Sequence, residues 1–142
     1  MPDRAFGRPA EAGTTGTAGP ARVLVLVYGI FALAAGSRAT VQLATRFAEA
    51  PVAYLLSAFA ALVYVVATVG LARGARGRRT ALAAIGVELA GVLVVGTLSL
   101  ADPAAFPDET VWSGYGRGYG YVPLVLPVLG LLLLRRTGRG RS

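Results

Sequence analysis

The sequence predicts an all-α membrane protein, an up-down bundle of four transmembrane helices with both termini in the cytoplasm. Three observations lead to this prediction: four long apolar segments, arginine clusters between them, and 55% hydrophobic residues in a chain of 142. Only 15% of the residues are charged, whereas an average soluble domain has about 25%.

The four apolar segments are Val23–Leu43, Val52–Ala72, Ala81–Ala101 and Val122–Leu134. A helix needs about 20 apolar residues to cross a bilayer, and the first three segments have that length. The fourth has 13 residues and would span only about 20 Å as a helix. We therefore expect a fourth helix over about 119–134 that begins before the apolar run. Alternatively, the Gly/Tyr-rich stretch before it completes the crossing under cover of protein.

The arginines predict the orientation, because cytoplasmic loops of membrane proteins are enriched in Lys and Arg. On one predicted side lie Arg4, Arg8, Arg22, Arg73, Arg76, Arg78, Arg79, Arg135, Arg136, Arg139 and Arg141. Arg38, Arg46 and Arg117 lie on the other side. This asymmetry predicts that both termini are cytoplasmic. All fourteen basic residues are Arg, and Ala and Gly are abundant, a composition that favours a bacterial origin and therefore a bacterial plasma membrane.

The flanks of the apolar region have a different composition. Residues 1–21 are rich in Gly, Ala, Thr and Pro and predict a disordered cytoplasmic tail. A transmembrane domain over 22–136 and a basic cytoplasmic tail over 137–142 follow. Ala32-Leu33-Ala34 is also compatible with a signal-peptide cleavage site, so cleavage of the first segment stays open.

The long connection before the fourth segment is aromatic. Trp112, Tyr115, Tyr119 and Tyr121 are amphipathic residues of the kind that sits at headgroup depth. Gly-Tyr-Gly occurs twice within Ser113–Tyr121, and we expect a flexible or tightly turned aromatic cap over the outer mouth of the bundle.

Composition also argues against several functions. The net charge of +7 does not indicate nucleic-acid binding, because the arginines cluster at segment ends rather than on one basic face. The chain has no Cys, which removes disulfides and thiolate chemistry. It has no His, which removes the commonest general base and metal ligand. We expect no cofactor and no enzyme activity. The expected partners are the lipid bilayer and either further copies of the chain or a larger membrane complex.

Helical spacing sorts the second segment into two faces. One face is small and polar, and it consists of Tyr54, Ser57, Ala61, Tyr64 and Thr68. The opposite face carries Leu55, Phe59, Leu62, Val66 and Val69, which suit lipid. We expect the small and polar face to pack against the other helices.

Glu88 is the candidate intramembrane site. An ionisable residue within a membrane helix usually faces the interior with a partner. Tyr64 and Glu88 lie twelve residues before and after Arg76, so a helical hairpin places them at similar depth, with Tyr28 within reach. Two interpretations stay open: a hydrogen-bonded residue that holds helices together, and a protonatable site for proton-coupled transport.

A second polar group is expected at the outer end of the bundle. Arg38, Gln42 and Asp102 form this candidate outer-layer site, in which Arg38 pairs with Asp102 or with Glu49. A structural ion pair is the leading interpretation, and contact with an anion or lipid headgroup is the alternative.

The region from Val23 to Arg136 resembles small four-helix integral membrane proteins of actinobacteria that have no assigned function. Three stretches carry the resemblance: Tyr28-Gly-Ile-Phe-Ala-Leu-Ala-Ala, Glu88-Leu-Ala-Gly-Val-Leu-Val-Val-Gly-Thr-Leu-Ser-Leu, and Phe106-Pro-Asp-Glu-Thr-Val-Trp-Ser-Gly-Tyr-Gly. The resemblance implies no activity. The leading prediction is a non-enzymatic accessory or structural subunit, and the alternative is a small proton-coupled transporter that uses Glu88.

Overall fold

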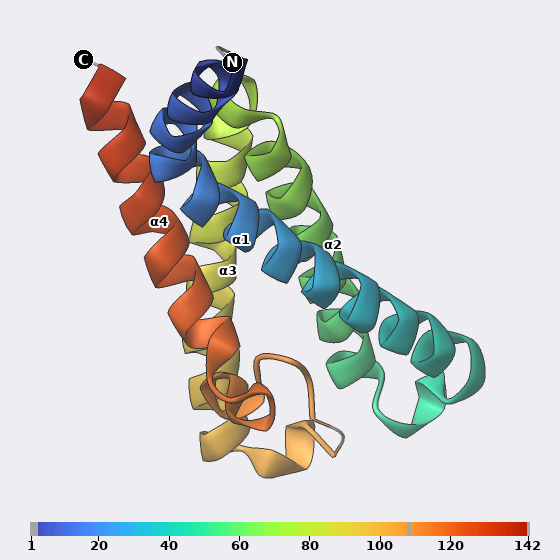
Figure 1. Ribbon diagram of the computed structural model, residues 1–142. Helices are drawn as coiled ribbons and strands as arrows, with labels where there is room; N and C mark the ends of the chain where they lie inside the picture. Colours follow the sequence, from blue (N-terminus) through green and yellow to red (C-terminus); the bar gives the residue numbers. More distant parts are fainter. Residues whose placement is uncertain (1–2, 108, 142) are drawn as a thin grey trace.

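The computed structural model describes the backbone of residues 3–107 and 109–141, and the side chains of residues 19–107 and 109–136. This part of the chain is all-helical and contains no strand (Figure 1). The α-helices are α1 (Asp3–Thr45), α2 (Pro51–Ala72), α3 (Arg78–Ala101) and α4 (Val122–Arg141). Short 3-10 helices connect them: η1 (Phe47–Glu49), η2 (Gly74–Gly77), η3 (Pro103–Ala105) and η4 (Ser113–Tyr119).

Three helical stretches are long and apolar enough to cross a membrane. They are Gly19–Thr45, Pro51–Ala72 and Gly74–Ala101. A fourth crossing is present if Ser113–Tyr119 and Val122–Arg136, which are bent by 99° relative to each other, count as one broken span. The prediction of a helical membrane protein is confirmed at this level.

The first helix is longer than predicted. α1 begins at Asp3, so its backbone covers most of the stretch that the composition predicted to be a disordered tail. α4 likewise continues to Arg141, through most of the predicted basic tail. The bounds of α2 and α3 lie within three residues of the predicted ones.

The fourth segment shows which of the two predicted arrangements the chain adopts. α4 starts at Val122 rather than near 119, because Gly120 has a left-handed backbone with φ 65°. The residues before it turn tightly, with positive φ at Gly114 and Gly116, a region that glycine occupies without steric cost. Tyr115 and Tyr121 also have positive φ, which side chains other than glycine rarely adopt. The Gly/Tyr-rich stretch is therefore a compact turn packed against α3, not an extension of α4.

The helices form two pairs that diverge toward one end. α1 packs mainly along α2, and α4 packs along α3; Figure 1 shows the pairs spreading apart toward the α1–α2 and α3–α4 connections. The long α3–α4 connection lies in this wedge. Its Phe106 packs against a small cluster of Ala50, Ala53 and Tyr54 at the start of α2.

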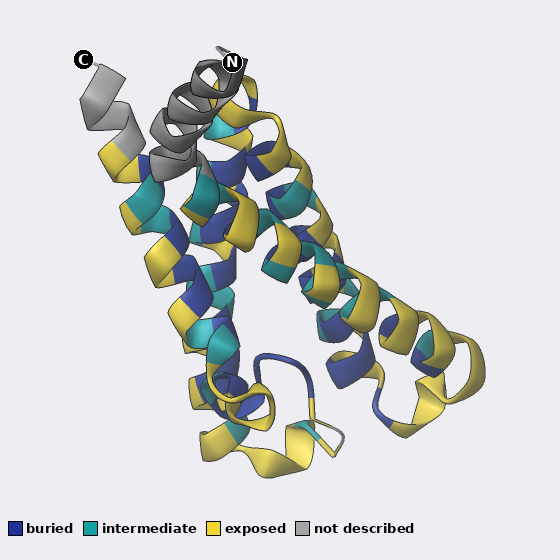
Figure 2. Ribbon diagram, in the orientation of Figure 1, coloured by how far each residue is buried: buried dark blue, intermediate teal, exposed yellow. Residues whose placement is uncertain are grey.

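Burial follows the predicted faces of α2 (Figure 2). Tyr54, Ser57, Ala61 and Tyr64 are buried, and Thr68 is half-buried. Leu55, Phe59, Leu62 and Val69 are exposed. Val66, which was also expected to face lipid, is half-buried against the main core. The main core contains Tyr28, Tyr64, Ile85, Val92 and Trp112.

Candidate functional site

Glu88 lies at the centre of the core. Its side chain is 0% exposed, as is that of Tyr28. The Tyr28 hydroxyl donates a hydrogen bond to Glu88 Oε1 over 2.5 Å. The bond joins α1 to α3 across sixty residues of sequence, so it fixes two helices that are not neighbours in the chain.

Tyr64 and Trp112 extend this site toward the wedge. Trp112 Nε1 donates a hydrogen bond to the Tyr64 hydroxyl over 3.0 Å. The Tyr64 ring lies 6.1 Å from the ring of Tyr28 and 6.4 Å from that of Trp112, distances at which aromatic pairs attract each other. We call Tyr28, Tyr64, Glu88 and Trp112 the polar layer.

The fourth helix closes the polar layer with a glycine. A Cβ placed on Gly130 of α4 would lie 3.7 Å from the Tyr28 hydroxyl and 3.0 Å from Ile85 Cδ1. The absence of a side chain at Gly130 therefore lets α4 approach α3 and α1 closely. All four α-helices and the α3–α4 connection meet at this depth.

Trp112 reaches the polar layer because α3 and the connection make room for it. A Cβ on Gly91 of α3 would overlap the indole ring. The turn that carries Trp112 is held by its own side chains: Ser113 Oγ accepts from the Thr110 amide over 2.8 Å, and Thr110 Oγ1 accepts from the Trp112 amide over 3.1 Å. Ser99 Oγ accepts from the Gly114 amide over 2.8 Å, which fastens the turn to α3.

Trp112, one of the aromatic residues expected of an interface, belongs instead to the main core. Trp112 is 1% exposed, because an indole N–H that finds an acceptor can be buried together with its ring. Tyr119 and Tyr121 are exposed, as expected of cap residues. Tyr115 is half-buried, with its ring on Gly96 and its hydroxyl 2.8 Å from Thr97 Oγ1.

The two residues predicted to lie near Glu88, Tyr64 and Tyr28, are both in the polar layer, but they exchange the predicted roles. Hairpin depth favoured Tyr64 as the partner, whereas Tyr28 makes the hydrogen bond to Glu88 and Tyr64 bonds to Trp112. The hairpin estimate considered only α2 and α3. In Figure 1, α1 crosses the view in front of α3, and this crossing brings the long Tyr28 side chain to Glu88.

The predicted outer-layer site is only partly assembled. Arg38 and Gln42 line the same surface groove, of about 550 Å³, together with Arg46. Asp102 is exposed and does not line that groove. Arg38 donates to the Tyr119 hydroxyl over 2.8 Å and to the Glu109 carbonyl over 3.3 Å.

The predicted pairing of Arg38 with Asp102 or Glu49 is therefore replaced by contacts with the α3–α4 connection. Glu49 instead lies 3.9 Å from Arg46. The reason is that the α3–α4 connection folds back into the wedge beside α1, which brings Tyr119 and Glu109 within reach of Arg38. Gln42 is 5% exposed, and its Oε1 has no hydrogen-bond partner in the described part of the chain.

The arrangement offers one carboxyl group to chemistry. Among the described residues, no three His, Cys, Asp or Glu side chains gather where they could hold a metal ion. Glu88 Oε2 is buried and has no hydrogen-bond partner there, so the group keeps one oxygen for a proton or a further donor. Sequence reasoning missed Trp112 and Gly130 as members of this site. Both residues depend on a glycine that faces an aromatic side chain of another element: Gly91 faces Trp112, and Gly130 faces Tyr28. Such a pairing can be recognised only once the packing of the helices is known.

Comparisons with protein families, with curated proteins and with solved structures give no match.

Proposed function

We propose that this chain is a non-enzymatic integral membrane protein of a bacterial plasma membrane. It crosses the bilayer four times as an up-down bundle, with both termini in the cytoplasm, and serves as a structural or accessory subunit of a membrane assembly. The observation that carries the proposal is the polar layer, whose central Glu88 is fully buried and hydrogen-bonded between α1 and α3.

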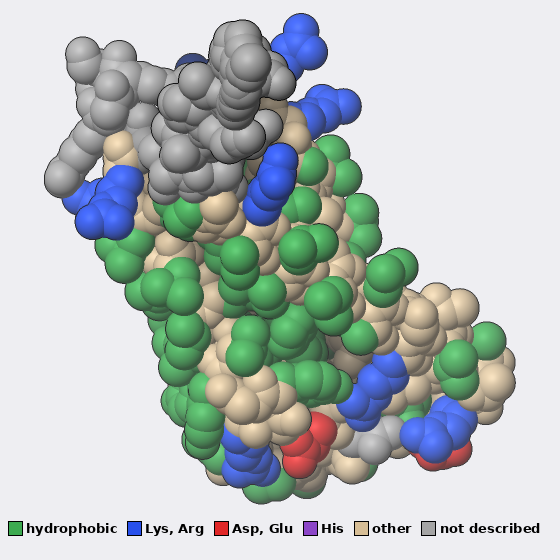
Figure 3. All heavy atoms as spheres, in the orientation of Figure 1, with side chains coloured by type: hydrophobic (Ala, Val, Ile, Leu, Met, Phe, Trp, Pro, Cys, Tyr) green, Lys and Arg blue, Asp and Glu red, His purple; other side chains and the backbone are tan. Residues whose placement is uncertain are grey.

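Charge supports the orientation. Figure 3 shows arginines at both ends of the molecule and an apolar belt between them, while acidic side chains gather at the end with the α3–α4 connection. The exposed acidic residues of the described part are Glu49, Asp102 and Glu109. Arg73, Arg76, Arg78 and Arg79 at the α2–α3 turn are on the opposite end, which the positive-inside rule assigns to the cytoplasm.

The natural absence of cysteine allows a direct test of this topology. Single cysteines are introduced at Ala75, in the α2–α3 turn, and at Ala104, in the α3–α4 connection; both positions are exposed. A membrane-impermeant maleimide applied to intact cells should label Ala104→Cys and should label Ala75→Cys only after permeabilisation. The reverse pattern would overturn the proposed orientation, and labelling of both in intact cells would overturn the four-span arrangement.

The polar layer supports a structural role because burial and bonding fix its geometry. Taking a carboxyl group into a membrane helix is costly unless it is paired inside the bundle, and the Tyr28 hydroxyl supplies that pairing. Lipid provides no hydrophobic driving force for helices to associate, so their packing depends on small residues and interhelical hydrogen bonds. The Tyr28–Glu88 hydrogen bond is such an interaction between α1 and α3.

The subunit role is tested by purification under mild detergent from its native membrane. A stoichiometric membrane partner, or a defined oligomer of the chain itself, is the expected result. Recovery only as a monomer, from cross-linked cells as well as from detergent, would contradict it.

A proton-coupled transporter that uses Glu88 is the second candidate, and the unbonded Glu88 Oε2 favours it. A transporting bundle would show proton-driven flux of a compound in proteoliposomes. Glu88→Gln should abolish that flux while the protein remains folded, because the amide keeps hydrogen bonding but cannot exchange a proton. Flux that persists in Glu88→Gln would exclude this role for Glu88.

A further inference from the structure

A groove between α1 and α4 lies at the end of the molecule where the arginines concentrate. It has a volume of about 760 Å³, within the range of about 300–1,000 Å³ that is common for ligand pockets. Its lining residues are Pro20, Val23, Leu24, Leu129, Leu132, Leu133, Arg135 and Arg136. The groove is therefore a leucine-lined slot with two arginines at its end.

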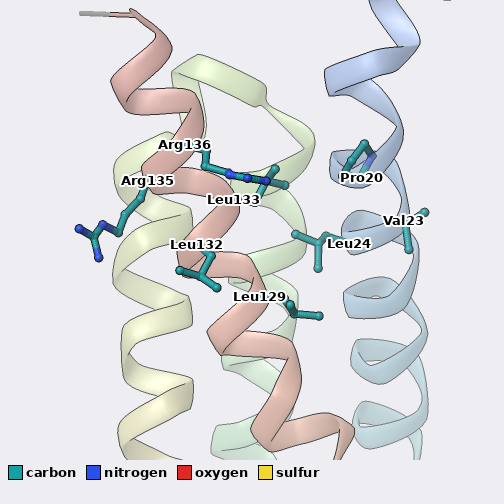
Figure 4. A pocket seen from close by; sticks show the side chains of 8 residues that line it. All are labelled: Pro20, Val23, Leu24, Leu129, Leu132, Leu133, Arg135 and Arg136. Carbon is teal, nitrogen blue, oxygen red and sulfur yellow. The ribbon is translucent and has the colours of Figure 1, made fainter.

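The groove exists because α4 is held to α3 rather than to α1. Arg78 at the start of α3 donates a hydrogen bond to the Leu134 carbonyl of α4 over 2.9 Å. α1 makes its main contacts with α2 and few with α4. The last apolar turn of α4 therefore stands apart from Leu24 of α1, and apolar side chains face each other across the space between them (Figure 4).

The two arginines differ in where they point. In Figure 4 the Arg136 side chain extends from α4 into the space toward α1, above Leu129, whereas the Arg135 side chain extends away from it. A cation at the end of an apolar slot is complementary to a molecule with an anionic head and a hydrocarbon tail. Basic pockets between transmembrane helices on the cytoplasmic side bind anionic lipid headgroups.

We propose that the α1–α4 groove binds an anionic phospholipid of the arginine-side leaflet, with its phosphate on Arg136 and one acyl chain between Leu24 and Leu129. Such a lipid has a charged headgroup and hydrocarbon chains, and the groove has Arg136 at one end and leucines below it. A free anion would leave the leucines uncovered, and a lipid without net charge, whose own cation offsets its phosphate, would leave the charge of Arg136 uncompensated. The inference rests on the proposed insertion in a membrane and is independent of the role of Glu88.

The test is native mass spectrometry of the full chain, delipidated in mild detergent, with phosphatidylglycerol or phosphatidylethanolamine of identical acyl chains. Phosphatidylglycerol should bind more tightly, as a single adduct on each chain. Arg136→Gln should weaken its binding about fivefold, the value of one basic residue near a charged lipid surface. Arg135→Gln, which removes the same charge from the next residue, should change it less than twofold.

A second pair of variants tests the apolar part. Leu129→Trp fills the groove and should abolish the bound adduct, whereas Leu62→Trp, at an equally exposed position on α2 outside the groove, should leave it intact. Arg136→Gln decides the proposal if Leu129→Trp does not fold. The proposal would be overturned if both lipids bind equally, or if Arg135→Gln and Arg136→Gln lose the same affinity for phosphatidylglycerol. It would also be overturned if the chain forms a dimer that Leu129→Trp disrupts. Glu88→Gln should bind phosphatidylglycerol as tightly as the unchanged chain does. A failure of the lipid-binding proposal can therefore be distinguished from a failure of the role proposed for the polar layer.

Discussion

The polar layer and the predicted outer-layer site began as similar expectations, each a few polar residues on apolar helices, yet only the first is assembled as a unit. Glu88 and Tyr28 have no exposed surface and bind each other. Arg38 and Asp102 are exposed, and Asp102 does not share the groove that Arg38 and Gln42 line. The difference is burial: a group at mid-helix must find a partner within the bundle, whereas one near the helix end can reach water, headgroups or a loop.

This comparison shows that the contacts of a polar residue are easier to predict when the residue lies deep in the bundle. The cost of an unpaired carboxyl group in the membrane interior leaves few arrangements open to Glu88. An arginine near the helix end has a long, flexible side chain that can extend to the interface, so Arg38 takes whichever partner the fold brings near. The variants below test this contrast, in order of decreasing expected effect.

Trp112→Ala should cause the largest loss. Trp112 is a fully buried ring that links the α3–α4 connection to Tyr64, and removing a buried aromatic side chain costs about 3–5 kcal/mol of unfolding free energy. The matched control is Phe47→Ala, an exposed aromatic residue in another connection, which should cost little. Equilibrium unfolding in mixed detergent micelles measures both, and similar losses would show that Trp112 does not anchor the polar layer.

Gly91→Ala should destabilise the protein while Gly86→Ala should not. A Cβ at Gly91 would overlap the Trp112 indole, whereas nothing lies within 4 Å of a Cβ at Gly86 on the same helix. Overpacking a filled core costs about 1–3 kcal/mol, and alanine in an open helical position is slightly favourable. Tryptophan fluorescence provides a second measurement, because this chain has a single Trp: Gly91→Ala should shift its emission and Gly86→Ala should not. An unshifted spectrum in Gly91→Ala would place the indole elsewhere.

Glu88→Leu should lower the unfolding free energy by about 0.6 kcal/mol and by no more than about 1.7 kcal/mol, the mean and the maximum for hydrogen bonds inside membrane bundles. Glu88→Gln should retain most of the stability, because its amide oxygen still accepts the Tyr28 hydroxyl. Thermal unfolding in detergent would order the variants as unchanged chain, Glu88→Gln, then Glu88→Leu. If Glu88→Leu were the most stable of the three, the polar layer would not be a stabilising element.

Arg38→Gln should have the smallest effect, about 0–1 kcal/mol, as for other exposed charged contacts. Its hydrogen bonds to Tyr119 and Glu109 lie on the surface, so solvent can replace them. The same unfolding measurement compares it with Arg46→Gln, which removes the surface pair with Glu49. A loss above that of Glu88→Leu would reverse the contrast between the two regions.

The parts of this fold that sequence reasoning predicted are those that local patterns determine. Apolar length indicated the spans, and spacing along α2 identified the buried face that carries Tyr64. Hairpin symmetry placed Glu88 near an aromatic hydroxyl, but it could not decide between Tyr28 and Tyr64, because that choice depends on the crossing of α1. The burial of Trp112 was missed because it depends on the wedge between helix pairs and on the space above Gly91.

The central claim is that the Tyr28–Glu88 contact holds α1 against α3, and a double-mutant cycle tests it most directly. Tyr28→Phe, Glu88→Leu and the double variant are unfolded in the same mixed micelles as the unchanged chain. If the hydrogen bond stabilises the bundle, the sum of the losses of unfolding free energy in the two single variants should exceed the loss in the double variant by about 0.6–1.7 kcal/mol. Losses that add to within about 0.3 kcal/mol, as for residues that do not interact, would contradict the account.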